Sequence, residues 1–224
     1  MEKMIPAGLA ACPLFAGVTP REAEKMLACL GGVRRTYSDA ETILREGEPA
    51  RALGIVLSGR ADITRTDFGG ARSVIGAAGP GELFAEAFAF AGAGPLPVDV
   101  TAAGATEVLL LDAAKLVHTC SNACEFHNTL VRNLLRIMAE KNLQMNRKIR
   151  ITSRRTTREK LLAYLRSEAS RAGSASFAIP FDRQELADYL EVDRSGLSAQ
   201  IGELRREGVL RCEKNRFTLL RKTE

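Results

Sequence analysis

The chain has 224 residues, of which 46% are hydrophobic and 26% charged, so it can build one large or two compact cores and is not disordered. Aromatic residues make up only 5%, which disfavours a stacking surface for single-stranded nucleic acid. The net charge of +5 is uneven. Residues 1–146 carry 14 basic and 16 acidic side chains (−2), and residues 147–224 carry 18 and 11 (+7). This asymmetry predicts a neutral module joined to one that binds a polyanion.

Neither a membrane span nor a secretory signal is visible in the sequence, so we expect a cytoplasmic protein with no membrane partner. Five scattered cysteines are expected to be free thiols: Cys12, Cys29, Cys120, Cys124 and Cys212. A metal or redox role stays open for Cys120 and Cys124, which are spaced to share a helix face, although buried structural thiols are favoured. Because His118 and His127 complete no zinc set, no metal site is predicted.

The first half of the chain has a strand-like pattern after one short helix. That helix is predicted within residues 14–30, where Thr19 can cap it, Pro20 suits its first turn and Glu22 completes a capping box. Short β-like runs follow at residues 42–44, 53–57, 61–64, 73–75 and 106–111. Glycine turns separate these runs, and the segment Asp67-Phe-Gly-Gly is expected to form a hairpin tip. The pattern predicts a small barrel or β-roll.

A long helix is predicted from about residue 121, over about eight turns. One apolar stripe, Leu130, Leu134 and Ile137, is expected to pack on the chain's own roll. A second stripe alternates spacings of four and three, which is typical of a coiled-coil seam with one polar member. Its members are Val131, Leu135, Met138, Asn142, Met145, Ile149 and Thr152. We predict a dimer interface there; the alternative is one broad buried face of a core helix.

The last third shows the start signals of three helices. A capping box at Thr156-Thr-Arg-Glu159 predicts a helix to about Ser170, and another at Asp182-Arg-Gln-Glu185 predicts a second. Asp193 can cap a third, from Arg194 to about Glu207. The last two are short helices joined by a three-residue turn, which predicts a helix-turn-helix whose second helix can enter the DNA major groove. Two short strands around the basic turn 213–216 predict a wing. An ordinary helical hairpin is the alternative, but it leaves the surplus of +7 unexplained.

Several stretches resemble the Crp/Fnr family of bacterial transcription regulators. They are Pro13-Leu-Phe-x-Gly17, Gly47-Glu48, Leu57-Ser-Gly59, Gly79-x-Gly81 and, most specifically, residues 183–195. The resemblance implies an α+β fold: an N-terminal β-roll, double-stranded and jelly-roll-like, then a long dimerisation helix and a C-terminal winged helix-turn-helix. The expected boundaries are an effector-binding roll at 1–120, the dimerisation helix at 121–154 and a DNA-binding domain at 155–224. It also implies a homodimer that binds a palindromic operator in double-stranded DNA, with RNA polymerase as a further partner.

The roll departs from the family's cyclic-nucleotide cassette, Phe-x-Gly-Glu followed by Arg-Ser or Arg-Thr. Here the two halves read Leu83-Phe-Ala-Glu86 and Leu96-Pro97, and residues 92–100 contain no basic side chain. Because a buried phosphate without a cationic partner is costly, we predict that cAMP does not bind tightly. The expected effector residues are Glu86, Leu96, Pro97 and Asn146, around an unidentified small, apolar or uncharged effector, or none.

No cofactor is predicted. The family's oxygen-sensing branch binds an iron–sulfur cluster through an N-terminal cysteine cluster, which this chain lacks, so no cluster is expected. A haem stays open because His118 or His127 could ligate one, although both are expected on polar faces near the start of the long helix.

The recognition helix also departs from the family. Ser195 stands at the usual Glu position and Ala199 at the usual Arg position. The predicted DNA-binding residues are Arg183, Gln184, Arg194, Ser195, Ser198, Gln200, Arg205, Arg206, Lys214 and Arg216, with base reading assigned to Arg194, Ser195, Ser198 and Gln200. The alternative function is a ligand-binding or scaffolding protein with this fold and weakened DNA binding. An enzyme is not predicted, because no nucleophile–base set or phosphate loop is present.

Overall fold

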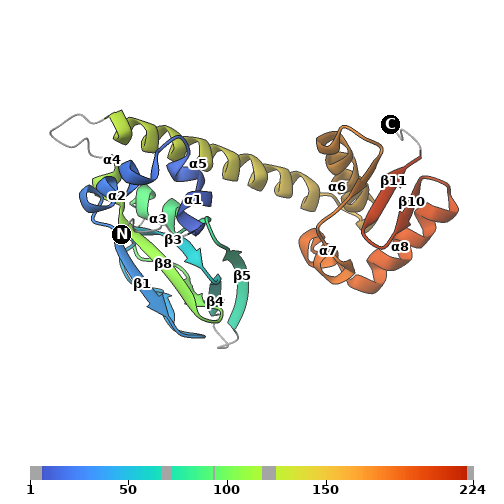
Figure 1. The fold of residues 1–224 in the computed structure, drawn as a ribbon. Helices are drawn as coiled ribbons and strands as arrows, with labels where there is room; N and C mark the ends of the chain where they lie inside the picture. The colour runs from blue at the N-terminus through green and yellow to red at the C-terminus, as the bar shows by residue number, and fades with distance from the viewer. Residues whose placement is uncertain (1–6, 67–71, 93, 118–124, 221–224) are drawn as a thin grey trace. The chain divides into compact units, whose positions relative to one another are not determined.

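The computed structural model describes residues 7–66, 72–92, 94–117 and 125–220 of the chain (Figure 1). They form two compact units, Met1–Glu140 and Lys141–Glu224. The boundary lies inside the longest helix, α5 (Glu125–Thr152). No described helix is both long and apolar enough to cross a membrane.

The first unit contains two antiparallel four-stranded sheets. One has the order β1 (Val33–Tyr37), β8 (Thr106–Asp112), β3 (Ala52–Ser58) and β6 (Leu83–Phe84). The other has the order β2 (Thr42–Leu44), β7 (Asp99–Ala102), β4 (Ala61–Thr66) and β5 (Arg72–Ala78). Val56, Phe84, Val100 and Val108 are buried together in one core cluster. The predicted roll is confirmed, and β1, β6 and β7 are strands that the sequence pattern missed.

Helices pack on the roll through a second apolar cluster. They are α1 (Ala7–Ala11), α2 (Pro20–Cys29), α3 (Glu86–Ala91), α4 (Ala113–Val117) and the first part of α5. Leu14, Leu53, Leu111 and Leu130 are each fully buried there, and each contributes about 1.5–3 kcal/mol to folding. Leu134 and Ile137 join the same cluster, as predicted. The predicted hairpin tip and the segment just before α5 lie outside the described residues.

The second unit has the predicted winged helix-turn-helix elements. They are α6 (Thr157–Ala172), β9 (Ser176–Ala178), α7 (Arg183–Leu190), α8 (Arg194–Arg206), β10 (Leu210–Glu213) and β11 (Arg216–Leu219). The three strands form one sheet in the order β10-β11-β9. Leu161, Leu186, Leu197, Leu204 and Phe217 are almost completely buried in its core.

Both predicted capping boxes of this unit are formed. At α6 the Glu159 amide donates to Thr156 Oγ1 at 3.2 Å, and the Thr156 amide donates to the Glu159 carboxylate at 3.1 Å. At α7 the corresponding distances between Asp182 and Glu185 are 2.8 Å and 2.7 Å. These caps satisfy amides that the first turn of a helix cannot pair, so they fix where α6 and α7 begin.

Candidate nucleic-acid interface

Helix α8 begins at a firmly bonded cap. Asp193 Oδ2 accepts hydrogen bonds from the Ser195 hydroxyl and, at 2.8 Å, from the Gly196 amide. These two bonds lower the pKa of Asp193, so its carboxylate is charged at the positive end of the helix dipole. Leu197 and Leu204 anchor the opposite side of the helix in the core. The first turn of α8 is therefore held in place with Arg194 exposed at its start.

The four predicted base readers differ in their surroundings. Arg194 and Ser198 are exposed, and neither side chain has a hydrogen bond or ion pair within the described part of the chain. Ser195 instead donates to the Asp193 cap. Gln200 is half-buried, and its Nε2 donates to Glu203 Oε2 at 2.6 Å. Arg194 and Ser198 are thus the two predicted readers whose polar groups have no partner within the described part of the chain.

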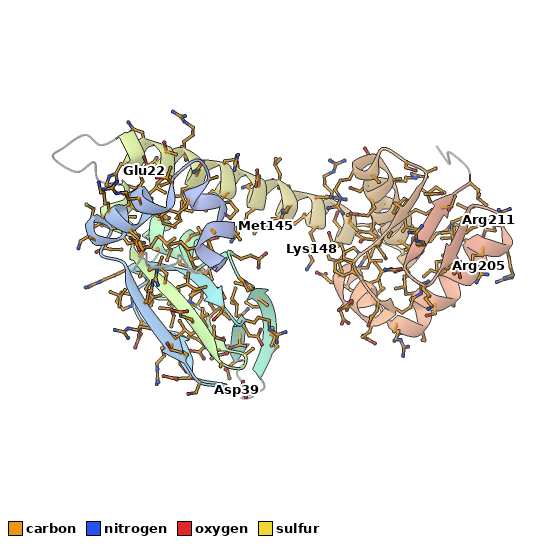
Figure 2. All side chains as sticks on the ribbon, in the orientation of Figure 1. Glu22, Asp39, Met145, Lys148, Arg205 and Arg211 are labelled. Atoms are coloured by element: carbon orange, nitrogen blue, oxygen red, sulfur yellow. The ribbon has the colours of Figure 1, made fainter. Side chains whose placement is uncertain are left out.

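Three arginines surround an open groove of about 570 Å³ beside the wing. Arg205 comes from the end of α8 and Arg211 comes from β10 (Figure 2). Arg216 comes from β11. All three are exposed and make no ion pair among the described residues. Arg211 is a cation that the sequence reasoning missed. Its place next to buried Leu210 could have revealed it, because successive strand residues point to opposite faces.

The remaining predicted contacts lie at the wing and on α7. Lys214 and Arg206 are exposed, and Lys214 lies in the turn between β10 and β11. Gln184 donates from Nε2 to Asp188 Oδ1 at 2.9 Å. Arg183 is half-buried, and its Nη2 donates to the backbone oxygen of Lys214 at 3.1 Å. The guanidinium of Arg183 is therefore bonded to the wing of its own unit.

Other cations of this unit have acidic partners. Arg147 and Arg171 both bind the buried carboxylate of Glu168, with Nη2–O distances of 2.5 Å and 2.6 Å. Arg158 binds Glu207 through both guanidinium ends. These ion pairs compensate the charges of three arginines within the unit, whereas the cations of α8 and the wing remain exposed.

Three of the four predicted effector residues, Glu86, Leu96 and Pro97, lie in the roll. Glu86 and Leu96 are buried, at 5% and 2% exposure, and Pro97 is exposed. Ala85 has φ +61°, so the left-handed turn persists although alanine replaces the family's glycine. The backbone of Leu96 is tied to the 47–48 turn by hydrogen bonds of 2.8 Å from its amide to Glu48 O and from the Gly47 amide to its own oxygen. Asn146 belongs to the second unit, where it donates to Asn142 Oδ1 at 2.6 Å.

Two family profiles match the chain. The cyclic nucleotide-binding domain matches residues 34–123, and the Crp-like helix-turn-helix domain matches residues 159–224. The chain belongs to the Crp/Fnr family. It is a transcription regulator of the Crp/Fnr type, with a cyclic nucleotide-binding-like roll and a DNA-binding helix-turn-helix.

Similar proteins include two bacterial regulators. The chain is 28% identical over 199 residues to the cyclic AMP receptor protein of Thermus thermophilus, covering 89% of this chain and 88% of that protein. It is 25% identical over 227 residues to the transcriptional activator FnrL of Cereibacter sphaeroides, covering 93% and 86%. The structure of the c-di-GMP responsive global regulator CLP of Xanthomonas campestris shares the fold, with a TM-score of 0.57, 19% identity and coverage of 89% and 98%.

For this Crp/Fnr regulator, the structure corrects one expectation about the histidines. His127 was expected on a polar face but is 3% exposed, and its Nε2 lies 3.3 Å from the backbone oxygen of Lys115 in α4. That expectation was wrong because the His127 ring lies against the backbone of α4 and is shielded from solvent. Burial raises the pKa of Cys12 to about 11, whereas Cys29 is exposed. His118, Cys120 and Cys124 lie outside the described residues. Within the described ranges, no cluster of three metal-ligating side chains is present.

Proposed function

We propose that this Crp/Fnr regulator binds an operator as a homodimer, with α8 of each subunit in the major groove and the wing on flanking phosphates. The observation that carries the proposal is a set of exposed cations on α8, the wing and the adjoining groove. They are Arg194, Arg205, Arg211, Lys214 and Arg216, none of which has an ion pair among the described residues. Exposed cations of this kind bind duplex DNA by releasing its condensed counterions.

Arg194 is the proposed principal base reader. It is the first residue of α8, and the N-terminal residues of a recognition helix are the ones that meet base edges. An arginine there can bond guanine O6 and N7 together. Ser198 is the second reader, since Ser195 and Gln200 are already bonded within their own turns. Because few side chains are proposed to read bases, we expect a short recognition sequence and a modest preference for it.

The proposed dimer contact is an apolar stripe on α5. Leu135, Met145 and Ile149 belong to the predicted seam and are 66%, 65% and 55% exposed, and large exposed apolar side chains along one helix face are typical of an interaction surface. Val131 and Met138, predicted in the same seam, are half-buried against the first unit's own core. The stripe supports pairing through α5, and a two-fold dimer would match a palindromic operator. Contact with RNA polymerase stays a prediction from the resemblance.

Selection of bound sites from random duplexes, followed by binding titrations, tests the DNA assignment. We expect Arg194→Ala to relax sequence preference, because base contacts specify, and Lys214→Ala to weaken binding evenly across sequences, because phosphate contacts position. Arg34→Ala, an exposed arginine in the first unit, is the matched control. If both variants keep the affinity of the wild type for all sequences, the DNA-binding assignment is wrong.

We also propose that the effector is not cAMP. Leu96 stands where the family's phosphate-binding arginine is expected, and its burial at 2% exposure supports an uncharged or unoccupied site. Calorimetric titration with cAMP is expected to show no tight binding. Affinity in the micromolar range or better would overturn this.

A further inference from the structure

Arg183 stands at the first position of α7, and its side chain contacts the wing in three ways. Its Nη2 atom donates to the backbone oxygen of Lys214 at 3.1 Å. Cys212 Sγ lies 3.6 Å from the same nitrogen. The guanidinium carbon is 5.2 Å from the centre of the Phe217 ring, within the range of a cation–π contact. One side chain thus joins α7 to both strands of the wing and to the turn between them.

The turn that Arg183 binds has an unfavourable backbone. Lys214 has φ +50°, in the left-handed region that residues other than glycine rarely adopt. Asn215 supplies a second connection, because its Nδ2 donates to Ile179 O at 3.0 Å and its own backbone oxygen accepts from the Ile179 amide at 2.9 Å. Lys214 is therefore bonded to the first residue of α7, and Asn215 is bonded to the segment that leads into α7. Their bonding leaves the side chains of Lys214 and Arg216 exposed.

We propose that Arg183 is a positioning residue that fixes the turn of the wing so that Lys214 meets a DNA phosphate, and that Arg183 does not itself contact DNA. This rests on the proposed function, because it assigns how one part of that interface is held. Arg183 is one of the DNA-binding residues predicted from the sequence, so the proposal changes its role. A direct contact that drew the guanidinium away from Lys214 O would release the turn that presents Lys214.

Substitution by lysine separates positioning from direct contact. Arg183→Lys keeps the charge but loses the planar fork, which suits both the carbonyl bond and the ring stacking. We expect Arg183→Lys and Arg183→Ala to lower affinity for a selected duplex equally, by about tenfold, and to reduce the salt slope by about one, as Lys214→Ala does. Sequence preference should stay unchanged, since the wing reads no bases. Arg183→Lys binding like the wild type would overturn the proposal.

A double-mutant cycle gives an independent test. If Arg183 acts through Lys214, the double variant Arg183→Ala/Lys214→Ala should bind no worse than the weaker single variant, because both remove the same phosphate contact. Losses that multiply would place Arg183 on a phosphate of its own.

Amide hydrogen exchange of the free full-length protein provides a test without DNA. Arg183→Ala should speed exchange in β10, β11 and their turn while α8 keeps the protection of the wild type, which also shows that the unit is folded. Unchanged exchange in the wing overturns the positioning role even if DNA affinity falls. Absence of duplex binding by the wild type overturns the proposed function, and the exchange result then decides alone whether Arg183 holds the wing.

Discussion

The first unit buries Leu96 where the family resemblance places a phosphate-binding arginine, whereas the second unit exposes Arg205, Arg211 and Arg216 around an open groove. In the roll, backbone hydrogen bonds of 2.8 Å hold Leu96 against the 47–48 turn, and no cation lies among residues 94–100. In the second unit, cations are abundant and several lack an internal partner among the described residues.

The contrast follows from the physics of binding two kinds of anion. A small anion in a closed pocket must lose its water, so it needs a buried cation and directed hydrogen bonds. A polyanion is bound at the surface, where exposed cations displace counterions and need little burial. The exposed arginines of α8 and the wing therefore suit the second unit to duplex DNA, and the leucine at position 96 supports the proposal that the roll does not bind cAMP.

The largest effect is expected from removing four exposed cations together. In the variant Arg205→Ala/Arg211→Ala/Lys214→Ala/Arg216→Ala, each lost cation removes one phosphate contact. Duplex affinity near 0.15 M salt should fall roughly 10²–10⁴-fold, and the slope of log affinity against log salt should decrease by about three to four. Fluorescence anisotropy over a salt series measures both quantities.

A matched variant in the roll shows whether position or total charge matters. Arg34, Arg35, Arg45 and Arg51 are also exposed, and their combined replacement by alanine removes the same charge. We expect its salt slope to equal that of the wild type. If the two fourfold variants lose affinity alike, the difference between the units does not determine DNA binding.

The next effect concerns the stability of the roll. Leu96→Ala should lower the free energy of unfolding of the first unit by about 2–5 kcal/mol, because it opens a cavity in packed surroundings. Leu96→Met, which conserves volume, should cost less than about 1.5 kcal/mol. Chemical denaturation measures both. A cost below about 0.5 kcal/mol for Leu96→Ala would indicate that Leu96 lines an open ligand cavity rather than a packed core.

Local signals in the sequence were sufficient for most of the second unit. The capping boxes at Thr156 and Asp182, and the cap at Asp193, predicted helix starts that the structure confirms. In the roll, β1 was missed because its first four residues are exposed and show no alternation of apolar and polar side chains. Such a strand is specified by pairing with β8 rather than by its own pattern.

The candidate site was less predictable because its geometry depends on contacts between distant residues. Arg183 and Lys214 are 31 positions apart, and nothing local indicates that one bonds the backbone of the other. Similarly, the partners of Ser195 and Gln200 decide which predicted readers are available, although residue type alone makes all four equivalent. Sequence identified the cations; the structure distinguishes bonded cations from exposed ones.

The smallest expected effect is a difference in acid sensitivity between the units. The hydrogen bond from Arg158 lowers the pKa of Glu207 below its ordinary value of 4.5. Bonds within their helix caps likewise lower the pKa values of Glu159 and Asp193. A lowered carboxylate pKa stabilises the fold above the ordinary value, and this contribution is lost as pH falls through the folded-state pKa. In the first unit, hydrogen bonds with Thr19 in the cap of α2 lower the pKa of Glu22 in the same way.

Glu207→Gln tests this pH dependence. At about pH 7 the variant should be slightly less stable than the wild type, because the ion pair with Arg158 is lost, and the difference should shrink as pH falls below about 4.5. Thermal unfolding followed over a pH series measures it, with Glu213→Gln, an exposed glutamate of β10, as the control. A difference that stays constant down to about pH 3 would mean that the ionised pair does not stabilise the second unit, because protonation of Glu207 should remove its advantage.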